Sequence, residues 1–151
     1  MKKTTSITLF LALITSILIF FDQITKWLIL TNQDKIYSIT GDFFQFQYSE
    51  NTGIAFGIPI RQDILIIITI VLLLFVIYLY TREFKIEKKL SQTTAVLVLA
   101  GGLGNLIDRV FRGYVIDFIS IWKYPDFNIA DIYITVGVLL MIVFYGKIKR
   151  A

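Results

Sequence analysis

Long apolar runs separated by short polar segments dominate this chain. Four of them, at about residues 5–30, 64–80, 93–107 and 129–145, are long enough, or nearly so, to cross the roughly 30 Å of hydrocarbon in a bilayer as helices. The third run is short and rich in glycine, and small residues are common where membrane helices pack closely. The pattern predicts an all-α polytopic membrane protein with four transmembrane helices, in which residues 1–151 form one domain.

Between the first two predicted helices, the period of the apolar residues changes to that of a strand. Residues 44–49 alternate between aromatic and polar side chains, which is typical of a strand with one apolar and one polar face. A Gly-Asp turn signal precedes this stretch, and residues 36–39 are a candidate partner strand. We therefore expect a small outward-facing β-sheet, or cradle, between the first and second helices.

The next segment, E-N-T-G-I-A-F-G from Glu50 to Gly57, leads the chain back toward the membrane. Its small residues allow the backbone to approach another backbone closely. This stretch, which includes Asn51, is a candidate for hydrogen bonding to an extended peptide.

Composition supports a membrane protein and excludes several kinds of chemistry. Of the 151 residues, 56% are hydrophobic and only 17% are charged, which is too apolar for an ordinary soluble domain. The net charge of +4 is explained by basic residues at the ends of membrane helices, so no nucleic-acid partner is expected. Without cysteine or histidine, the chain has no thiolate nucleophile and no Cys- or His-based metal site, and we expect no metal or cofactor.

The distribution of basic residues predicts the orientation of the chain. The two termini and the segment between the second and third helices hold nine of the 15 Lys and Arg residues, and the opposite side holds six. An excess of Lys and Arg marks the cytoplasmic side. We therefore expect both termini in the cytoplasm and residues 31–63 and 108–128 at the outer face of the membrane.

Two aspartates on the outer side lie in apolar surroundings: Asp117 in V-I-D-F-I and Asp131 in F-N-I-A-D-I. Ionisable residues at membrane depth are costly and usually functional. Burial should raise the pKa of Asp117, whereas the dipole at the start of the fourth helix favours an anion at Asp131. Carboxyl groups in such different environments suit acid–base chemistry, although a buried acceptor and a helix-start acid are simpler explanations for each alone. Asp126 is better interpreted as a turn or helix cap.

Other polar residues on the outer side also have structural explanations. Asp22 and Lys26 are four residues apart and can form a neutral pair near the end of the first helix. On the third helix, Asn105 and Asp108 share a face that should point into the bundle. Arg109 follows directly and can pair with a carboxylate, and a carboxylate beside an arginine is a poor proton carrier.

Five motifs of this chain, in their order, resemble the lipoprotein signal peptidases (signal peptidase II). They are F-D-Q-I-T-K (21–26), N-T-G-I-A-F (51–56), G-G-L-G-N-L-I-D-R (101–109), G-Y-V-I-D-F (113–118) and F-N-I-A-D (127–131). Each motif alone is weak, whereas the ordered set is highly specific. The resemblance covers essentially the whole chain, including its length and its four predicted spans.

The resemblance implies a bacterial aspartic endopeptidase, multi-pass in the cell membrane, that removes signal peptides from prolipoproteins. Such enzymes cut on the N-terminal side of a diacylglyceryl-modified cysteine and are blocked by the cyclic peptide globomycin. Asp117 and Asp131 match the catalytic pair of the family. Residues that match the lining or support of its site are Asn51, Asn105, Asp108, Arg109, Asn128, Asp22 and Lys26. We expect membrane lipid and lipid-modified prolipoproteins as partners, and a monomeric enzyme.

An Asp–Asp pair that shares one proton can hydrolyse a peptide without a metal. The ionised partner activates a water, and the protonated partner donates to the carbonyl oxygen. Which aspartate starts as the base is left open by the sequence. Two other functions fit part of the pattern: a proton- or ion-coupled transporter and a non-catalytic scaffold. A serine protease that uses Ser120 and Lys123 fits by spacing alone.

Overall fold

The computed structural model describes residues 2–54 and 58–150. In this part of the chain, three helices are long and apolar enough to cross a membrane. They are α1 (Lys2–Leu30), α2 (Gln62–Arg82) and α3 (Lys89–Phe111). The prediction of a mostly helical membrane protein is confirmed, and each of these helices extends slightly beyond the run expected for it.

The fourth predicted run forms a shorter helix. α4 (Ile129–Val143) is apolar and has 15 residues, and it is followed by the four-residue α5 (Tyr145–Ile148). A helix of 15 residues is about 22 Å long, which is less than the hydrocarbon thickness. A fourth complete span therefore stays a prediction.

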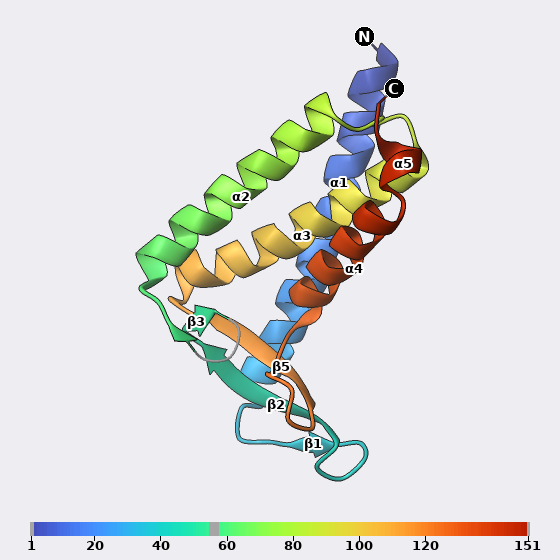
Figure 1. Ribbon diagram of the computed structural model, residues 1–151. Coiled ribbons are helices and arrows are strands. Elements are labelled where there is room, and N and C mark those ends of the chain that lie inside the picture. Colours follow the sequence, from blue (N-terminus) through green and yellow to red (C-terminus); the bar gives the residue numbers. More distant parts are fainter. Residues whose placement is uncertain (1, 55–57, 151) are drawn as a thin grey trace.

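A three-stranded antiparallel sheet lies at one end of the helices (Figure 1). Its order is β1 (Tyr37–Ser38), β2 (Phe44–Asn51) and β5 (Val115–Ile121). The predicted pairing of the first two strands is confirmed, with Tyr37 opposite Phe46. The third strand was not predicted, because β5 comes from the segment between α3 and α4 rather than from the segment between the first two helices.

A second, two-stranded sheet is formed by β3 (Gly53–Ile54) and β4 (Ile58–Pro59). It carries the chain from β2 to α2 (Figure 1).

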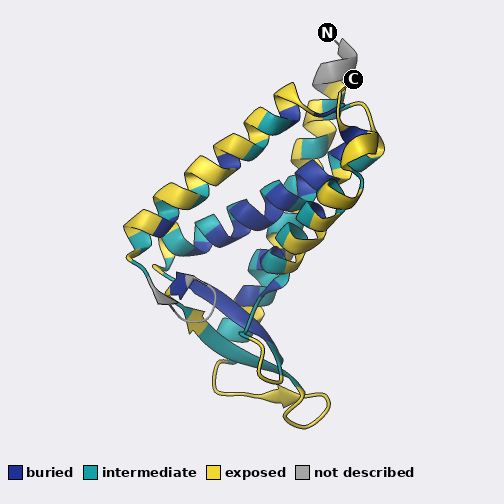
Figure 2. Cartoon of the chain, viewed as in Figure 1, coloured by how far each residue is buried: buried dark blue, intermediate teal, exposed yellow. Residues whose placement is uncertain are grey.

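α3 is the central helix, since it packs against α1, α2 and α4. Figure 2 shows it as the most buried helix, whereas α2 is largely exposed. Three glycines allow this close packing. A Cβ at Gly101 would overlap the carbonyl oxygen of Ala130 on α4, a Cβ at Gly102 would lie 2.7 Å from Leu73 on α2, and one at Gly104 would lie 2.7 Å from Asp22 on α1.

At the end of the bundle away from the three-stranded sheet, where the two termini lie, a small core ties α2, α3 and α5 together (Figure 1). It consists of Tyr80, Phe84, Ala95 and Ile148. The backbone N–H of Lys85 donates to the carbonyl oxygen of Ile148 at 2.8 Å, so the C-terminal segment is fastened to the connection between α2 and α3.

Candidate active site

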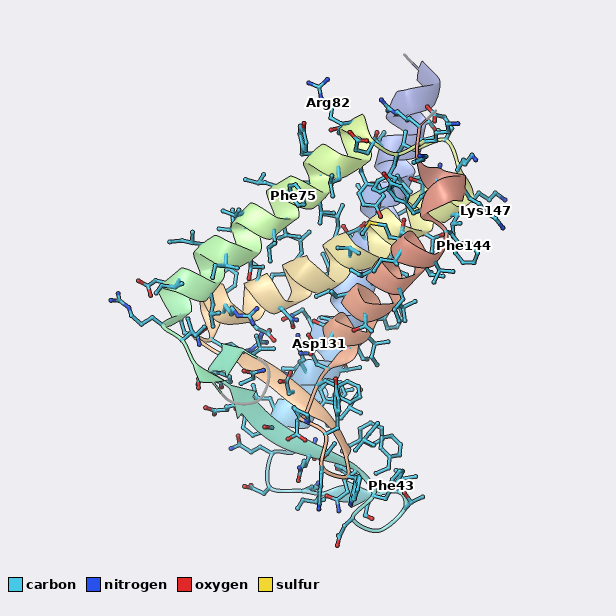
Figure 3. The ribbon with its side chains drawn as sticks, in the orientation of Figure 1. Phe43, Phe75, Arg82, Asp131, Phe144 and Lys147 are labelled. Atoms are coloured by element: carbon cyan, nitrogen blue, oxygen red, sulfur yellow. The ribbon has the colours of Figure 1, made fainter. Side chains whose placement is uncertain are left out.

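Polar side chains from four parts of the chain meet where the helices end on the sheet. Asp117 lies on β5 and Asn51 ends β2, while Asn105 lies on α3. Asn128 immediately precedes α4, and Asp131 lies in the first turn of that helix (Figure 3). The structure brings these five predicted site residues into one hydrogen-bonded group.

Asp117 is held by the pairing of β5 with β2 and is only 2% exposed. Ser49 lies opposite it, directly after an irregularity in the pairing of β2, and such irregularities re-aim nearby side chains. The Nδ2 of Asn51 donates to Asp117 Oδ2 at 2.8 Å, and the Nδ2 of Asn128 donates to Oδ1 at 2.6 Å. Both carboxyl oxygens of this buried acid therefore have an amide donor.

The pKa of Asp117 is raised from the ordinary aspartate value to about 7. Burial is the largest cause, because it disfavours the charged form, and the negative charge of Asp131 acts in the same direction. The hydrogen bonds from Asn51 and Asn128 and the charge of Lys26 lower the pKa in part. Asp117 can therefore gain or lose a proton near neutral pH, as an acid–base group must.

Asp131 is fixed by a reciprocal cap at the start of α4. The side-chain oxygen of Asn128 accepts from the Asp131 N–H at 3.0 Å, and Asp131 Oδ2 accepts from the Asn128 N–H at 3.1 Å. The Nδ2 of Asn105 donates to Asp131 Oδ1 at 2.8 Å. Asp131 lies in the first turn, as predicted. Of the two interpretations of Asp126, a turn or a helix cap, the helix cap is wrong, because Asn128 is the N-cap of α4.

Asn128 connects the two carboxyl groups. Its side chain donates to Asp117, its backbone N–H donates to Asp131, and its Nδ2 also lies 3.1 Å from the oxygen of Asn105. Asn128 is fully buried. Because a single capping residue contacts both acids, the start of α4 sets the position of one carboxyl group relative to the other.

A buried ionic cluster adjoins this pair. Lys26 Nζ lies 2.9 Å from Asp22 Oδ2 and 2.9 Å from Asp108 Oδ2, and it donates to Asn105 Oδ1 at 3.1 Å. The three charged side chains are fully buried. Removing one partner of such a buried ion pair costs about 3–5 kcal/mol, since the other charge loses its compensation. The cluster thus links α1 to α3. Asn105, which accepts from Lys26 and donates to Asp131, connects the cluster to Asp131 by hydrogen bonds.

Asp108 also forms an ion pair with Arg112, the first residue after α3, rather than with the adjacent Arg109. Residues four apart lie on the same face of a helix, whereas adjacent residues do not. The second oxygen of Asp22 accepts from the N–H of Ala130 at 3.0 Å, so the cluster also contacts the first turn of α4.

Arg109 is a further charged residue near the two acids. Its charge interacts with those of Asp131, Asp117 and Asp108. Its buried Nε has no hydrogen-bond partner in the described part of the chain. A guanidinium with a free donor can hold a peptide carbonyl or a phosphate oxygen.

Comparison with known proteins identifies the family of the chain. The family described as signal peptidase (SPase) II matches residues 14–146. The chain belongs to the signal peptidase II family. A lipoprotein signal peptidase from Clostridium tetani is 41% identical over 139 residues, covering 85% of this chain and 87% of the relative. One from Borrelia duttonii is 35% identical over 147 residues, covering 85% of each chain.

Two solved structures of bacterial membrane enzymes are similar to this signal peptidase II chain. One, determined by the in meso method at 2.3 Å resolution, is 34% identical, has a TM-score of 0.82 and covers 91% of this chain and 87% of its own. The other, determined in the same way at 1.9 Å resolution, is 34% identical, has a TM-score of 0.73 and covers 88% of this chain and 90% of its own.

The structure adds polar residues of this signal peptidase II chain that sequence reasoning missed. Gln23 donates to Asp108 Oδ1 at 3.1 Å and accepts from Arg112 at 3.1 Å. The spacing of Asp108 and Arg112 on one helix face was a usable signal. Gln23 stands in the motif F-D-Q-I-T-K but was not singled out, because its contacts join residues more than 80 positions apart.

The glycine-rich motif that was expected to bind an extended peptide is described only in part. Residues 55–57 lie outside the described residues. Before them, the N–H of Gly53 donates to Asn51 Oδ1 at 3.1 Å, which orients the Asn51 amide toward Asp117. Across residues 2–54 and 58–150, no group of three or more acidic side chains is arranged to hold a metal ion.

Proposed function

We propose that this member of the signal peptidase II family is a lipoprotein signal peptidase of the aspartic type. It removes the signal peptide from a prolipoprotein by cutting on the N-terminal side of a diacylglyceryl-modified cysteine. Membership of the family and the names of the relatives support the substrate class. The observation that carries the aspartic chemistry is the contact of Asn128 with both Asp117 and Asp131.

In this proposal, Asp117 holds the proton of the resting pair. Its pKa of about 7 supports that role, because much of it is protonated at neutral pH. Asp131, whose oxygens accept from Asn105 and from the Asn128 N–H, acts as the base and takes a proton from a bound water. The water oxygen attacks the scissile carbonyl carbon while Asp117 donates its proton to the carbonyl oxygen. When the C–N bond breaks, Asp131 gives this proton to the leaving amine, and Asp117 takes a proton back from a hydroxyl of the tetrahedral intermediate as the new carboxyl group forms.

Arg109 then positions the substrate. The free Nε of Arg109 can donate to a peptide carbonyl or to the oxygen that gains negative charge. Preorganised donors of this kind contribute several kcal/mol to the stabilisation of a transition state in other hydrolases, about 2.7–4 kcal/mol for a single donor.

The two competing functions have less support. A transporter needs ionisable groups along its path, whereas the small core at the opposite end of the bundle consists of Tyr80, Phe84, Ala95 and Ile148, none of which is an acid or a base that carries charge at neutral pH. A scaffold has no need for a buried acid with a raised pKa. The serine alternative is weakened because Ser120 Oγ accepts from Gln47 at 3.2 Å and Lys123 lies over the ring of Trp122.

Cleavage of a purified, lipid-modified prolipoprotein by the purified full chain tests the proposal. We expect Asp117→Asn and Asp131→Asn each to lower the cleavage rate by about 10²- to 10⁴-fold, the usual contribution of acid–base groups. Each change keeps the size of the side chain and removes only the acid. Globomycin should inhibit the unmodified chain.

Asp42→Asn is the matched control, because Asp42 is an exposed aspartate in a turn at the far end of the sheet. It should cleave at the normal rate. Normal cleavage by either Asp117→Asn or Asp131→Asn, with an unchanged unfolding temperature, would refute the Asp–Asp mechanism. Absence of cleavage by the unmodified chain would refute the proposed activity itself.

A further inference from the structure

An apolar groove unrelated to the candidate site runs between α1 and α3 at the end of the bundle where the N-terminus lies. Its volume is about 450 Å³. Ile14 and Leu18 of α1 form one wall, and Val96 and Leu97 of α3 form the other. Figure 2 shows that this part of α1 remains only partly covered by the rest of the chain.

The groove changes from apolar to polar at one end only. Lys89, the first residue of α3, lines that end together with Gln92 and Thr93. Lys89 and Thr93 are exposed, and within the described residues Lys89 has no ion-pair partner. From Lys89 to Leu97 the helix rises about 12 Å, close to half of the roughly 30 Å of hydrocarbon in a bilayer. The groove therefore extends over about one leaflet, with a free ammonium group at its mouth.

Other basic residues lie at the same end of the bundle. The connection between α2 and α3 and the C-terminal segment are joined by backbone hydrogen bonds, such as that from Arg150 N–H to the Glu83 carbonyl oxygen at 2.7 Å. Residues 82–89 and 147–150 together carry seven Lys or Arg and two Glu. Basic residues near a membrane surface attract acidic lipid.

From this combination we infer that the groove between α1 and α3 binds an acidic diacyl phospholipid. One acyl chain lies along Ile14, Leu18 and Leu97, and the phosphate-bearing headgroup lies against Lys89. The positive charge of Lys89 at the mouth of the groove favours an acidic phospholipid over other occupants. A transmembrane helix of a partner would be indifferent to an ammonium group there, and a zwitterionic lipid would gain little from it. The site lies in the leaflet at the basic end of the bundle and is independent of the proposed peptidase activity.

Native mass spectrometry of the full chain tests the inference. The protein is purified in detergent and mixed with equal amounts of phosphatidylglycerol and phosphatidylcholine, and the ratio of the two lipids retained is measured. We expect retention of phosphatidylglycerol to exceed that of phosphatidylcholine. Lys89→Gln should reduce this preference about fivefold, the factor that corresponds to about 1 kcal/mol per basic residue. Lys123→Gln, which removes an exposed lysine on the sheet side, should leave it unchanged.

A second pair of variants tests the groove itself. Ile14→Trp fills it and should abolish the preference although Lys89 is present. Leu13→Trp places the same ring on the exposed face of α1 and should have no effect. Equal retention of the two lipids by the unmodified chain overturns the inference, as does an equal effect of Lys89→Gln and Lys123→Gln. A preference that persists in Ile14→Trp, with unfolding temperature unchanged, shows binding to surface charge alone and also overturns it.

Discussion

Two amide side chains oppose the forces that keep a proton on Asp117. Asn51 and Asn128 donate to its two oxygens, and such bonds favour the charged carboxylate. Burial and the negative charge of Asp131 favour the neutral acid and prevail, so the pKa is about 7. The pKa that results from these opposing effects sets the pH range in which Asp117 and Asp131 together hold one proton.

We therefore expect kcat/KM for prolipoprotein cleavage to fall as the pH rises above about 7, because Asp117 then loses the proton it must donate. Asn51→Ala removes a hydrogen bond to the charged form, which raises the pKa of Asp117 further. The fall should accordingly begin at a higher pH in Asn51→Ala than in the unmodified chain. Rates measured between pH 5 and pH 9 check this, a range of about two pH units on either side of the pKa.

The same raised pKa has a consequence for stability. Between about pH 4 and pH 7 the folded state keeps the proton on Asp117, whereas the unfolded chain has released it. This group's contribution to stability is therefore fully present below about pH 4 and is lost as the pH rises through about 7. For the cleavage rates, a kcat/KM that falls at the same pH in the unmodified chain and in Asn51→Ala would contradict the assignment of the proton to Asp117.

At the residue scale, the sequence predicted which side chains would gather but not how each is held. Asp117 and Asp131 were recognisable because acids in apolar segments are costly. The partners of Asp108 were not, since Lys26 and Gln23 reach it from α1 across more than 80 positions of sequence. These pairs form only when α1 packs against α3, and the spacing of residues within one segment does not predict that contact.

At the element scale, the packing of α3 on α4 positions the acids. The backbone of Gly101 lies against Ala130, and Ala130 lies between Asn128 and Asp131. We expect Gly101→Ala to push the start of α4 away, to lower stability by about 1–3 kcal/mol, as overpacking usually does, and to slow cleavage. Thermal unfolding in detergent and the cleavage rate measure the two effects.

Gly146→Ala is the control for this prediction. It makes the same change in α5, where a Cβ would meet no atom within 4 Å. It should leave the cleavage rate unchanged and be neutral or slightly stabilising, because alanine is favoured over glycine in helices. Equal stability and activity of the two variants would show that the contact between Gly101 and Ala130 does not position the site.

The elements differ in how far sequence patterns reveal them. β2 was predicted because only one of its faces is apolar, so its side chains alternate. β5 was missed because V-I-D-F-I is buried at every position and shows no alternation. The third apolar run was the weakest predicted span because of its glycines, yet these glycines make α3 the central, most buried helix.

At the scale of the whole molecule, the orientation in the membrane remains a prediction from the basic residues at the end opposite the three-stranded sheet. We expect the sheet outside the cell membrane and both termini inside. The chain has no cysteine, so single cysteines can be introduced without background labelling. Thr40→Cys, exposed beside β1, should react in cells with a membrane-impermeant maleimide, and Glu87→Cys, exposed between α2 and α3, should react only after lysis.

The unsubstituted chain controls for labelling of other groups and should remain unlabelled. If Glu87→Cys reacted in intact cells and Thr40→Cys did not, the orientation would be the reverse of the one predicted. The candidate site would then face the cytoplasm, and a role in processing exported prolipoproteins would be untenable.

The pairing of Asp22 with Lys26 also bears on how the chain enters a membrane during synthesis. α1 emerges from the ribosome long before α3, and its two charges would be costly in lipid if each were alone. They lie one helical turn apart and form an ion pair within α1 itself. The first helix can thus insert as an electrically neutral unit. Asp108 on α3 and Arg112, the first residue after that helix, form a second pair whose charges also cancel, and Asp108 then joins Lys26 when α3 packs against α1.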